Sequence, residues 1–144
     1  AGVRAMLDAE IAPLETLHRL VPLATHAVFS DQGIYAFAGT GDLETALRRV
    51  AANHAGHVGA SCGPEGYAWL EDGKLRRVPA PKVEVVDTLS AGDVFHGALA
   101  LALAEGRPMD AAARFACVAA SIKCTRFGGR LGCPTREEVL AAGG

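Results

Sequence analysis

The sequence is most informative at residues 85–95, which read VVDTLSAGDVF. An apolar run ends at Asp87, a turn of small residues follows, and from about Ala91 the pattern becomes that of a helix. In such a turn backbone N–H groups converge at the helix N-terminus, where they lack partners within the helix and carry the positive end of its dipole. This arrangement predicts a site for an anion such as phosphate at residues 90–92.

Asp93 follows in the first turn of this predicted helix, so its carboxylate would stand beside a bound phosphate. The pattern alone leaves two interpretations open. An aspartate in a first helical turn ordinarily serves the cap and the helix dipole, and here it can also serve catalysis. His96 lies three residues later and can share a helical face with Asp93, although a supporting or packing role is favoured over that of a base.

Strand-like and helix-like patterns alternate on both sides of this segment. We predict strands at residues 26–30, 57–61 and 83–86, a hairpin over 67–78 that turns at Asp72-Gly73, and helices at 14–21, 43–50, 91–104, 110–122 and from 135 onward. Asp42 and Asp110 are predicted N-caps, and Thr135 with Glu138 predicts a capping box. The alternation predicts one α/β domain over residues 1–144 with a mainly parallel sheet.

Composition excludes several classes of protein. Half of the 144 residues are hydrophobic, which is enough for a core. The 14 basic and 16 acidic residues give no basic excess, which argues against a nucleic-acid partner. The longest apolar stretch is too short to cross a membrane, and the first residues lack the pattern of a signal peptide.

The cysteines and histidines do not form a recognisable metal motif. The four cysteines contain no C-x-x-C pair, so we expect reduced thiols in a cytoplasmic protein. His54 and His57 form an H-x-x-H without the intervening glutamate of zinc proteases. We therefore expect them in a solvated turn or helix end.

Residues 87–95 resemble the C-terminal signature of the ribokinase-like (PfkB) sugar kinases, D-T-x-G-A-G-D-x-F, with Ser90 where glycine is commonest. Similarity extends to residues 63–66, 115–120, 125–129 and 134–139, which look like the nucleotide turn, the helix flanking the adenine, the closing loop and the last helix of that family. The resemblance implies a three-layer, Rossmann-like ribokinase fold. Members of the family are about twice as long, so the chain is expected to be the C-terminal, ATP-binding portion of such a fold.

The resemblance also implies roles for individual residues. Asp93 would be the general base that takes the proton from a sugar hydroxyl, and the amides of Ala91, Gly92 and Asp93 would form the anion hole for the transferring γ-phosphoryl group. Asp87, together with carbonyls of the loop at residues 126–133, would match the monovalent-cation site of ribokinases, although a turn-forming role for Asp87 stays open. The implied nucleotide site is lined by Ser61, Gly63, Gly66, Ser90, Cys117 and Gly128.

The implied cofactors are ATP and Mg²⁺, with K⁺ as a further candidate, and the implied partner is a small sugar, with a homodimer as a candidate state of the full-length protein. One departure concerns Mg²⁺. Where the family has N-x-x-E, residues 30–33 read SDQG, so Asp31 or Gln32 would have to compensate. A second departure is the missing N-terminal half, which in the family supplies the sugar-binding residues and the lid.

Three classes of function therefore stand. The first is an ATP-dependent sugar kinase, of which the isolated 144-residue chain is expected to have little or no activity. The second is a non-catalytic nucleotide- or phosphate-binding module, or an inactive fragment without a sugar site. The third is a structural interaction fragment in which the Gly-rich turns are only turns.

Overall fold

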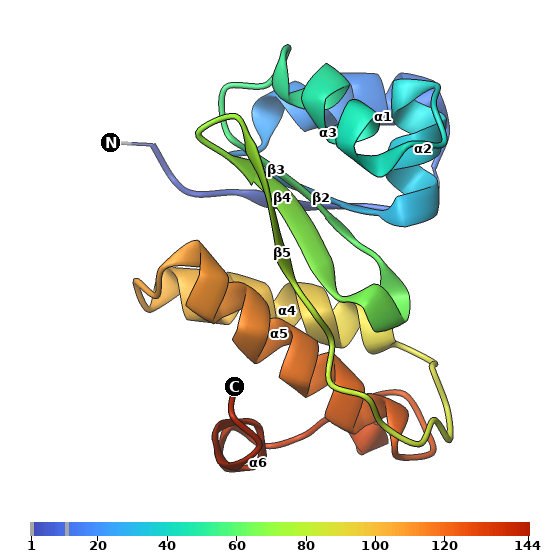
Figure 1. Cartoon of the computed structure of the whole chain (residues 1–144), viewed down its shortest axis with the longest axis vertical. Coiled ribbons are helices and arrows are strands. Elements are labelled where there is room, and N and C mark those ends of the chain that lie inside the picture. Colours follow the sequence, from blue (N-terminus) through green and yellow to red (C-terminus); the bar gives the residue numbers. More distant parts are fainter. Residues whose placement is uncertain (1, 11) are drawn as a thin grey trace. The chain divides into compact units, whose positions relative to one another are not determined.

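The chain forms two compact units that are interleaved along the sequence. The structure is a computed structural model that describes residues 2–10 and 12–144 (Figure 1). Unit 1 comprises residues 1–62 and 68–77, and unit 2 comprises residues 63–67 and 78–144. The polypeptide thus passes from one unit to the other three times, after Cys62, Tyr67 and Arg77.

Unit 1 is built around a five-stranded sheet with strand order β1-β2-β3-β4-β5. Its elements are β1 (Met6–Ala9), α1 (Leu14–Leu20), the 3₁₀ turn η1 (Val21–Leu23), β2 (His26–Ser30), α2 (Asp31–Ala38), α3 (Leu43–Ala51), β3 (His57–Ser61), β4 (Tyr67–Glu71) and β5 (Lys74–Val78). The first three strands are parallel, and their register aligns His26 with His57 and Ser30 with Ser61. The predicted strands at 26–30 and 57–61 are confirmed, and so is the mainly parallel α/β class.

The hairpin of β4 and β5 is also confirmed. Asp72 and Gly73 form its two-residue turn with φ values of 50° and 72°. A two-residue connection can join only antiparallel strands, and positive φ at both positions is what a type I′ turn requires. The Asp-Gly turn therefore makes β4 and β5 an antiparallel pair at one edge of the otherwise mainly parallel sheet.

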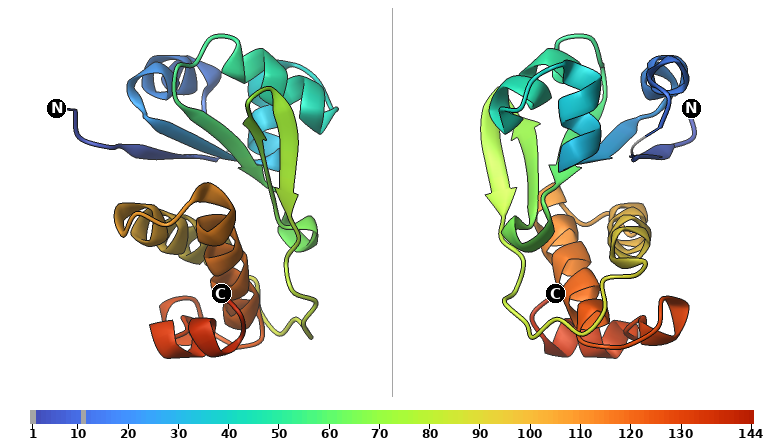
Figure 2. Two further views of the ribbon diagram at one scale, coloured as in Figure 1. Left: turned by 60° about the vertical axis from the view of Figure 1, so that its left-hand side comes forward. Right: turned by 90° about the vertical axis from the view of Figure 1, so that its right-hand side faces the viewer.

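Helices α1, α2 and α3 lie on one face of this sheet (Figures 1 and 2). Successive crossovers step in the same direction across the sheet, and a common right-handed sense places their helices on the same side. Phe29, Ile34 and Leu47 are completely buried between the helices and the strands. This core fixes the carboxyl ends of β2 and β3, where Ser30 and Ser61 lie.

Unit 2 is mostly helical. It contains the 3₁₀ turn η2 (Gly63–Glu65), α4 (Ala91–Ala104), α5 (Met109–Cys124), the 3₁₀ turn η3 (Arg130–Gly132) and α6 (Arg136–Ala141). The predicted helix at 91–104 is confirmed to the residue. Helices α4 and α5 pack along each other and are joined by residues 105–108.

Three local predictions are wrong. Residues 83–86 form no strand; Val85 and Val86 are exposed, and the amide of Val86 donates to the carbonyl of Cys124 at 2.8 Å instead. Asp110 does not cap α5, because Pro108 is the N-cap and Asp110 lies in the first turn. His54 is not solvated, since it is buried and its Nε2 lies 3.1 and 3.0 Å from the carbonyls of Val21 and Ala24. His57, expected in the same turn or helix end, begins strand β3 instead.

Two predicted caps are confirmed. The Asp42 carboxylate accepts from the amide of Thr45 at 2.8 Å at the start of α3. Thr135 and Glu138 form the predicted capping box at the start of α6. Over residues 2–10 and 12–144, the helices are too short or too polar to cross a bilayer.

Candidate functional site

The N-terminus of α4 presents open hydrogen-bond donors. Ser90 is its N-cap in the left-handed conformation, with φ 61°, and its side chain makes no capping bond. The amide of Ala91 donates to the carbonyl of Thr88 at 3.0 Å, and that of Val94 donates to Ser90 at 3.0 Å. Among the described residues, the amides of Gly92 and Asp93 have no acceptor. Two of the three predicted anion-hole donors are thus open, and the third is already engaged.

Asp93 and His96 occupy different environments on α4. Asp93 is exposed, and its carboxylate has no hydrogen bond or ion pair to any described residue. His96 is buried; its Nδ1 lies 2.9 Å from the carbonyl of Gly92, which can only accept, so Nδ1 donates. The imidazole packs edge-on against Phe95. His96 therefore stabilises the first turn of α4, as a supporting residue would, and leaves Asp93 as the free titratable group.

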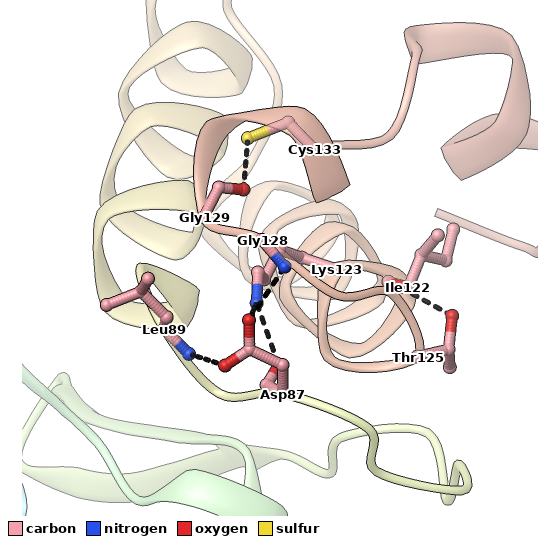
Figure 3. Close-up of polar contacts among 8 residues, drawn as sticks. All are labelled: Asp87, Leu89, Ile122, Lys123, Thr125, Gly128, Gly129 and Cys133. Atoms are coloured by element: carbon pink, nitrogen blue, oxygen red, sulfur yellow. Dashed lines mark hydrogen bonds and ion pairs between the residues drawn. The ribbon is translucent and has the colours of Figure 1, made fainter.

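The Asp87 carboxylate joins two segments that are far apart in the sequence (Figure 3). Its Oδ1 accepts from the amide of Leu89 at 2.9 Å, and its Oδ2 accepts from the amide of Gly128 at 2.9 Å. These amides, that of Leu89 foremost, lower the pKa of Asp87. The bond to Leu89 is the aspartate turn expected of a turn-former, and the bond to Gly128 ties that turn to the loop after α5.

Lys123 is a residue of this site that the sequence reasoning missed. It lies in the last turn of α5, completely buried, and its Nζ donates to the carbonyl of Asp87 at 2.7 Å. Nζ also lies 3.4 Å from Asp87 Oδ2 (Figure 3). The signal that could have found it is a single lysine among the mostly apolar residues 115–124, because a buried ammonium needs an anionic partner.

The same corner brings together Ser90 and the Gly-rich loop. A Cβ at position 129 would lie 3.0 Å from Ser90 Oγ and 3.5 Å from the Leu89 side chain. Glycine at position 129 is therefore what allows the loop to approach the α4 N-terminus so closely. Asp87, Ser90 and Gly128 are thus neighbours, as the proposed phosphate site requires.

Gly66 and Cys117 form a second cluster around Val78. A Cβ on Gly66 would lie 2.0 Å from the carbonyl of Val78, and the φ of Gly66 is 90°. Cys117 is buried, and its thiol lies 3.9 Å from the same carbonyl. Gly63, with φ 51°, has open space where a Cβ would point. Packing alone thus explains Gly66, whereas Gly63 leaves its backbone accessible.

Ser61 and residues 30–33 belong to unit 1. Ser61 ends β3, and its hydroxyl donates to the carbonyl of Phe29 at 3.4 Å. Ser30 caps α2 by accepting from the amide of Gly33 at 3.0 Å. A Cβ on Gly33 would lie 2.6 Å from the carbonyl of Ala9. A glutamate at this position, as in N-x-x-E, does not fit the local backbone.

Comparison with known proteins shows the family of the chain. The model of the family described as pfkB family carbohydrate kinase matches residues 1–136. The chain belongs to the pfkB family of carbohydrate kinases. The matched region includes the Asp87-to-Phe95 segment, and the α/β architecture is that of the ribokinase-like fold.

Individual pfkB-type relatives are similar to the chain over parts of their length. A ribokinase of Bacillus subtilis is 47% identical over 77 residues, which is 54% of this chain and 26% of that protein. A solved structure from Agrobacterium tumefaciens, provisionally described as a ribokinase, is 44% identical with a TM-score of 0.92 and covers 96% of this chain and 46% of its own. Arabidopsis thaliana ribokinase, solved with ribose and ATP, is 30% identical with a TM-score of 0.80 and covers 96% of this chain and 47% of its own. The chain spans less than half the length of these relatives.

Proposed function

We propose that this chain carries the nucleotide- and phosphate-handling part of an ATP-dependent sugar kinase. The observation that supports this most directly is the first turn of α4, where the unpaired Asp93 carboxylate stands next to the open amides of Gly92 and Asp93. A carboxylate beside free N–H donors at the positive end of a helix suits both proton abstraction and binding of a transferring phosphoryl group. Membership in the pfkB family and the sugar and ATP in the Arabidopsis relative point the same way.

Phosphoryl transfer depends mainly on positioning and charge stabilisation. In the proposed mechanism, the Gly92 and Asp93 amides donate to oxygens of the transferring γ-phosphoryl group. The amide of Ala91, which donates to the carbonyl of Thr88, donates to the phosphoryl group as well in a bifurcated hydrogen bond. The Asp93 carboxylate accepts the proton of the sugar hydroxyl as that oxygen forms its bond to phosphorus, and the bond from phosphorus to the departing ADP breaks.

The nucleotide is proposed to lie near the other predicted residues. Gly63 has open space on its Cβ side, so its backbone can contact a ligand closely, while Ser90 and Gly128 border the phosphate end. Cys117 is buried against Val78 and would serve as part of the wall behind the nucleotide. Ser61, at the end of β3 in unit 1, stays a nucleotide-site prediction from the sequence. Mg²⁺ enters as part of the MgATP substrate, without a glutamate at position 33.

We further propose that the 144-residue chain alone binds nucleotide but does not phosphorylate a sugar, because it spans less than half of its solved relatives. The four cysteines form no disulfide, and the proposed compartment is the reducing cytoplasm.

Nucleotide binding to the chain itself tests the first half of the proposal. ATP or ADP at about one hundred times its Kd would stabilise the folded chain by ~2.7 kcal/mol, visible as a rise in Tm. Robust phosphorylation of any sugar by the chain alone would contradict the proposal that it binds nucleotide without phosphorylating a sugar. No shift at millimolar nucleotide would favour the structural-fragment alternative.

Substitution of Asp93 tests the catalytic half, in the longest natural polypeptide that contains residues 1–144. Asp93→Asn should lower kcat by roughly 10²- to 10⁴-fold while the Kd for ATP stays the same. Asp110→Asn is the matched control, because Asp110 is also an exposed aspartate in the first turn of a helix but lies at the start of α5. Equal kcat values for the two variants would remove Asp93 from the base role and leave a non-catalytic nucleotide-binding module.

A further inference from the structure

Lys123 is the most completely buried cation that the structure describes. Its side chain has 0% exposure, and its two nearest acceptors both belong to Asp87, the backbone carbonyl at 2.7 Å and Oδ2 at 3.4 Å (Figure 3). Burying an ammonium without partners is very costly, so these contacts take the place of its water shell.

Few oxygen atoms around Asp87 are left to coordinate a second cation. Each carboxylate oxygen already accepts a backbone amide, from Leu89 and from Gly128. In the loop at residues 126–133, the carbonyls of Gly128, Gly129 and Arg130 accept from the amides of Gly132 and Cys133.

A bound alkali cation exchanges its water shell for several oxygen ligands, and here both carboxylate oxygens of Asp87 and three carbonyls of the loop already accept N–H donors. An ion next to the Lys123 ammonium would also meet strong repulsion in a poorly screened setting. The donor set of Asp87 and its loop therefore does not fit K⁺.

We propose that the Lys123 ammonium is the resident cation of this loop, so that the chain needs no monovalent metal ion there. It neutralises Asp87, which in turn holds the 87–90 turn and the 126–133 loop against the N-terminus of α4. Lys123 is a positioning residue, since it acts through Asp87. The inference concerns ion dependence and is tested without turnover, so it can fail while the kinase proposal stands.

The first test is the Tm of the unmodified chain in KCl, NaCl and choline chloride at one ionic strength. A resident ammonium gives the same Tm in all three salts. A Tm that is selectively higher in KCl would overturn the proposal, because it would show that K⁺ binds the folded state.

The second test removes the ammonium. Lys123→Ala leaves Asp87 without its cation and opens the space of the side chain, so its Tm in choline chloride should fall by roughly 10 °C. KCl or NH₄Cl should recover part of this loss, whereas choline is too large to enter. If the variant is unfolded in choline chloride, the same recovery is measured as folding by circular dichroism. Loss without recovery in either salt would mean that Lys123 acts by packing alone and would overturn the proposal.

Two further variants separate charge from volume. Lys123→Met removes the charge but fills the space, so its Tm should fall without responding to K⁺. A potassium response as large as that of Lys123→Ala would contradict the proposal. Lys82→Ala, at an exposed lysine in the same unit, should behave as the unmodified chain in all three salts.

Discussion

Arg126 and Glu138 meet in a two-pronged ion pair, with Nη2 2.5 Å from Oε1 and Nη1 3.1 Å from Oε2. The pair ties the loop after α5 to the first turn of α6, where Glu138 also completes the capping box. The guanidinium of Arg126, followed by the amide of Thr135, lowers the pKa of Glu138 from 4.5 to about 2. The same carboxylate thus serves the ion pair and the helix cap.

Acid should therefore weaken unit 2 in a defined window. Because the folded-state pKa of Glu138 is depressed, its contribution to stability is present above pH 4.5 and is lost as the pH falls from 4.5 to about 2. Glu138→Gln should flatten the dependence of Tm on pH in this window. Glu137→Gln, which removes an exposed carboxyl from the same turn, is the control, and an equal flattening by both variants would contradict the prediction.

His57 is expected to make the stability of the fold depend on pH in a second range, between pH 6.5 and 4. Its ring lies 5.6 Å from that of His26, its register partner, and burial, with the nearby His26 and His54, lowers the pKa of His57 from 6.5 to about 4. As the pH falls from 6.5 to 4, the unfolded chain binds a proton that the folded chain does not, so stability should decline by roughly 3 kcal/mol.

His57→Phe should remove most of this decline in urea titrations at a series of pH values. His26 has a pKa lowered by burial and by Arg4 as well, and it should account for a remaining part. His18→Gln changes an exposed histidine and should leave the decline intact. The prediction does not survive if His57→Phe keeps the full decline.

Gly66 and Gly63 offer a matched comparison within one turn. An alanine Cβ at position 66 would lie 2.0 Å from the carbonyl of Val78, whereas at position 63 it would meet nothing within 4 Å. Both residues have positive φ, so both substitutions carry backbone strain. Gly63→Ala should cost ~1 kcal/mol of unfolding free energy, and Gly66→Ala roughly 3 kcal/mol or more. Equal losses of unfolding free energy in urea denaturation would contradict the prediction, because they would show that the backbone at Val78 shifts at little cost.

Replacement of Ser90 by glycine should stabilise the folded chain. It is held at φ 61°, a conformation that costs a residue with a Cβ about 1–2 kcal/mol. Glycine removes this strain, but it loses more conformational entropy on folding than serine does, which offsets part of the stabilisation. Ser90→Gly should raise the unfolding free energy by roughly 0.5–1 kcal/mol, while Ser90→Ala keeps the strain and should not. A stabilisation by alanine as large as that by glycine would refute the explanation by strain.

The sequence predicted those elements whose signals are local. Asp72-Gly73 specifies its own turn, Asp42 and Thr135 cap the helices that follow them, and the pattern after Ser90 marks the start of α4. Strand β1 and helix α2 escaped prediction. Gly33 lies against the carbonyl of Ala9, which is a contact between segments that no short sequence window reveals.

The wrong strand prediction at residues 83–86 and the missed Lys123 have the same origin. Val85 and Val86 have strand-like side chains, but the amide of Val86 bonds to the end of α5, 38 residues away in the sequence (124 − 86), instead of to a neighbouring strand. Within the candidate site, the residues of the signature segment could be named in advance because they are contiguous. Lys123 could not, because its importance comes from a partner 36 residues away.

The three passages of the polypeptide between the two units have a consequence for dissecting the gene. Neither unit is a continuous segment, since residues 63–67 of unit 2 are inserted in the sequence of unit 1. Any single cut between residues 62 and 78 therefore leaves at least one unit without part of its chain. Residues 1–77 hold all of unit 1 together with residues 63–67, and residues 63–144 hold all of unit 2 together with residues 68–77. A product that holds one unit and nothing of the other requires a rearranged gene in which a new connection replaces the inserted segment.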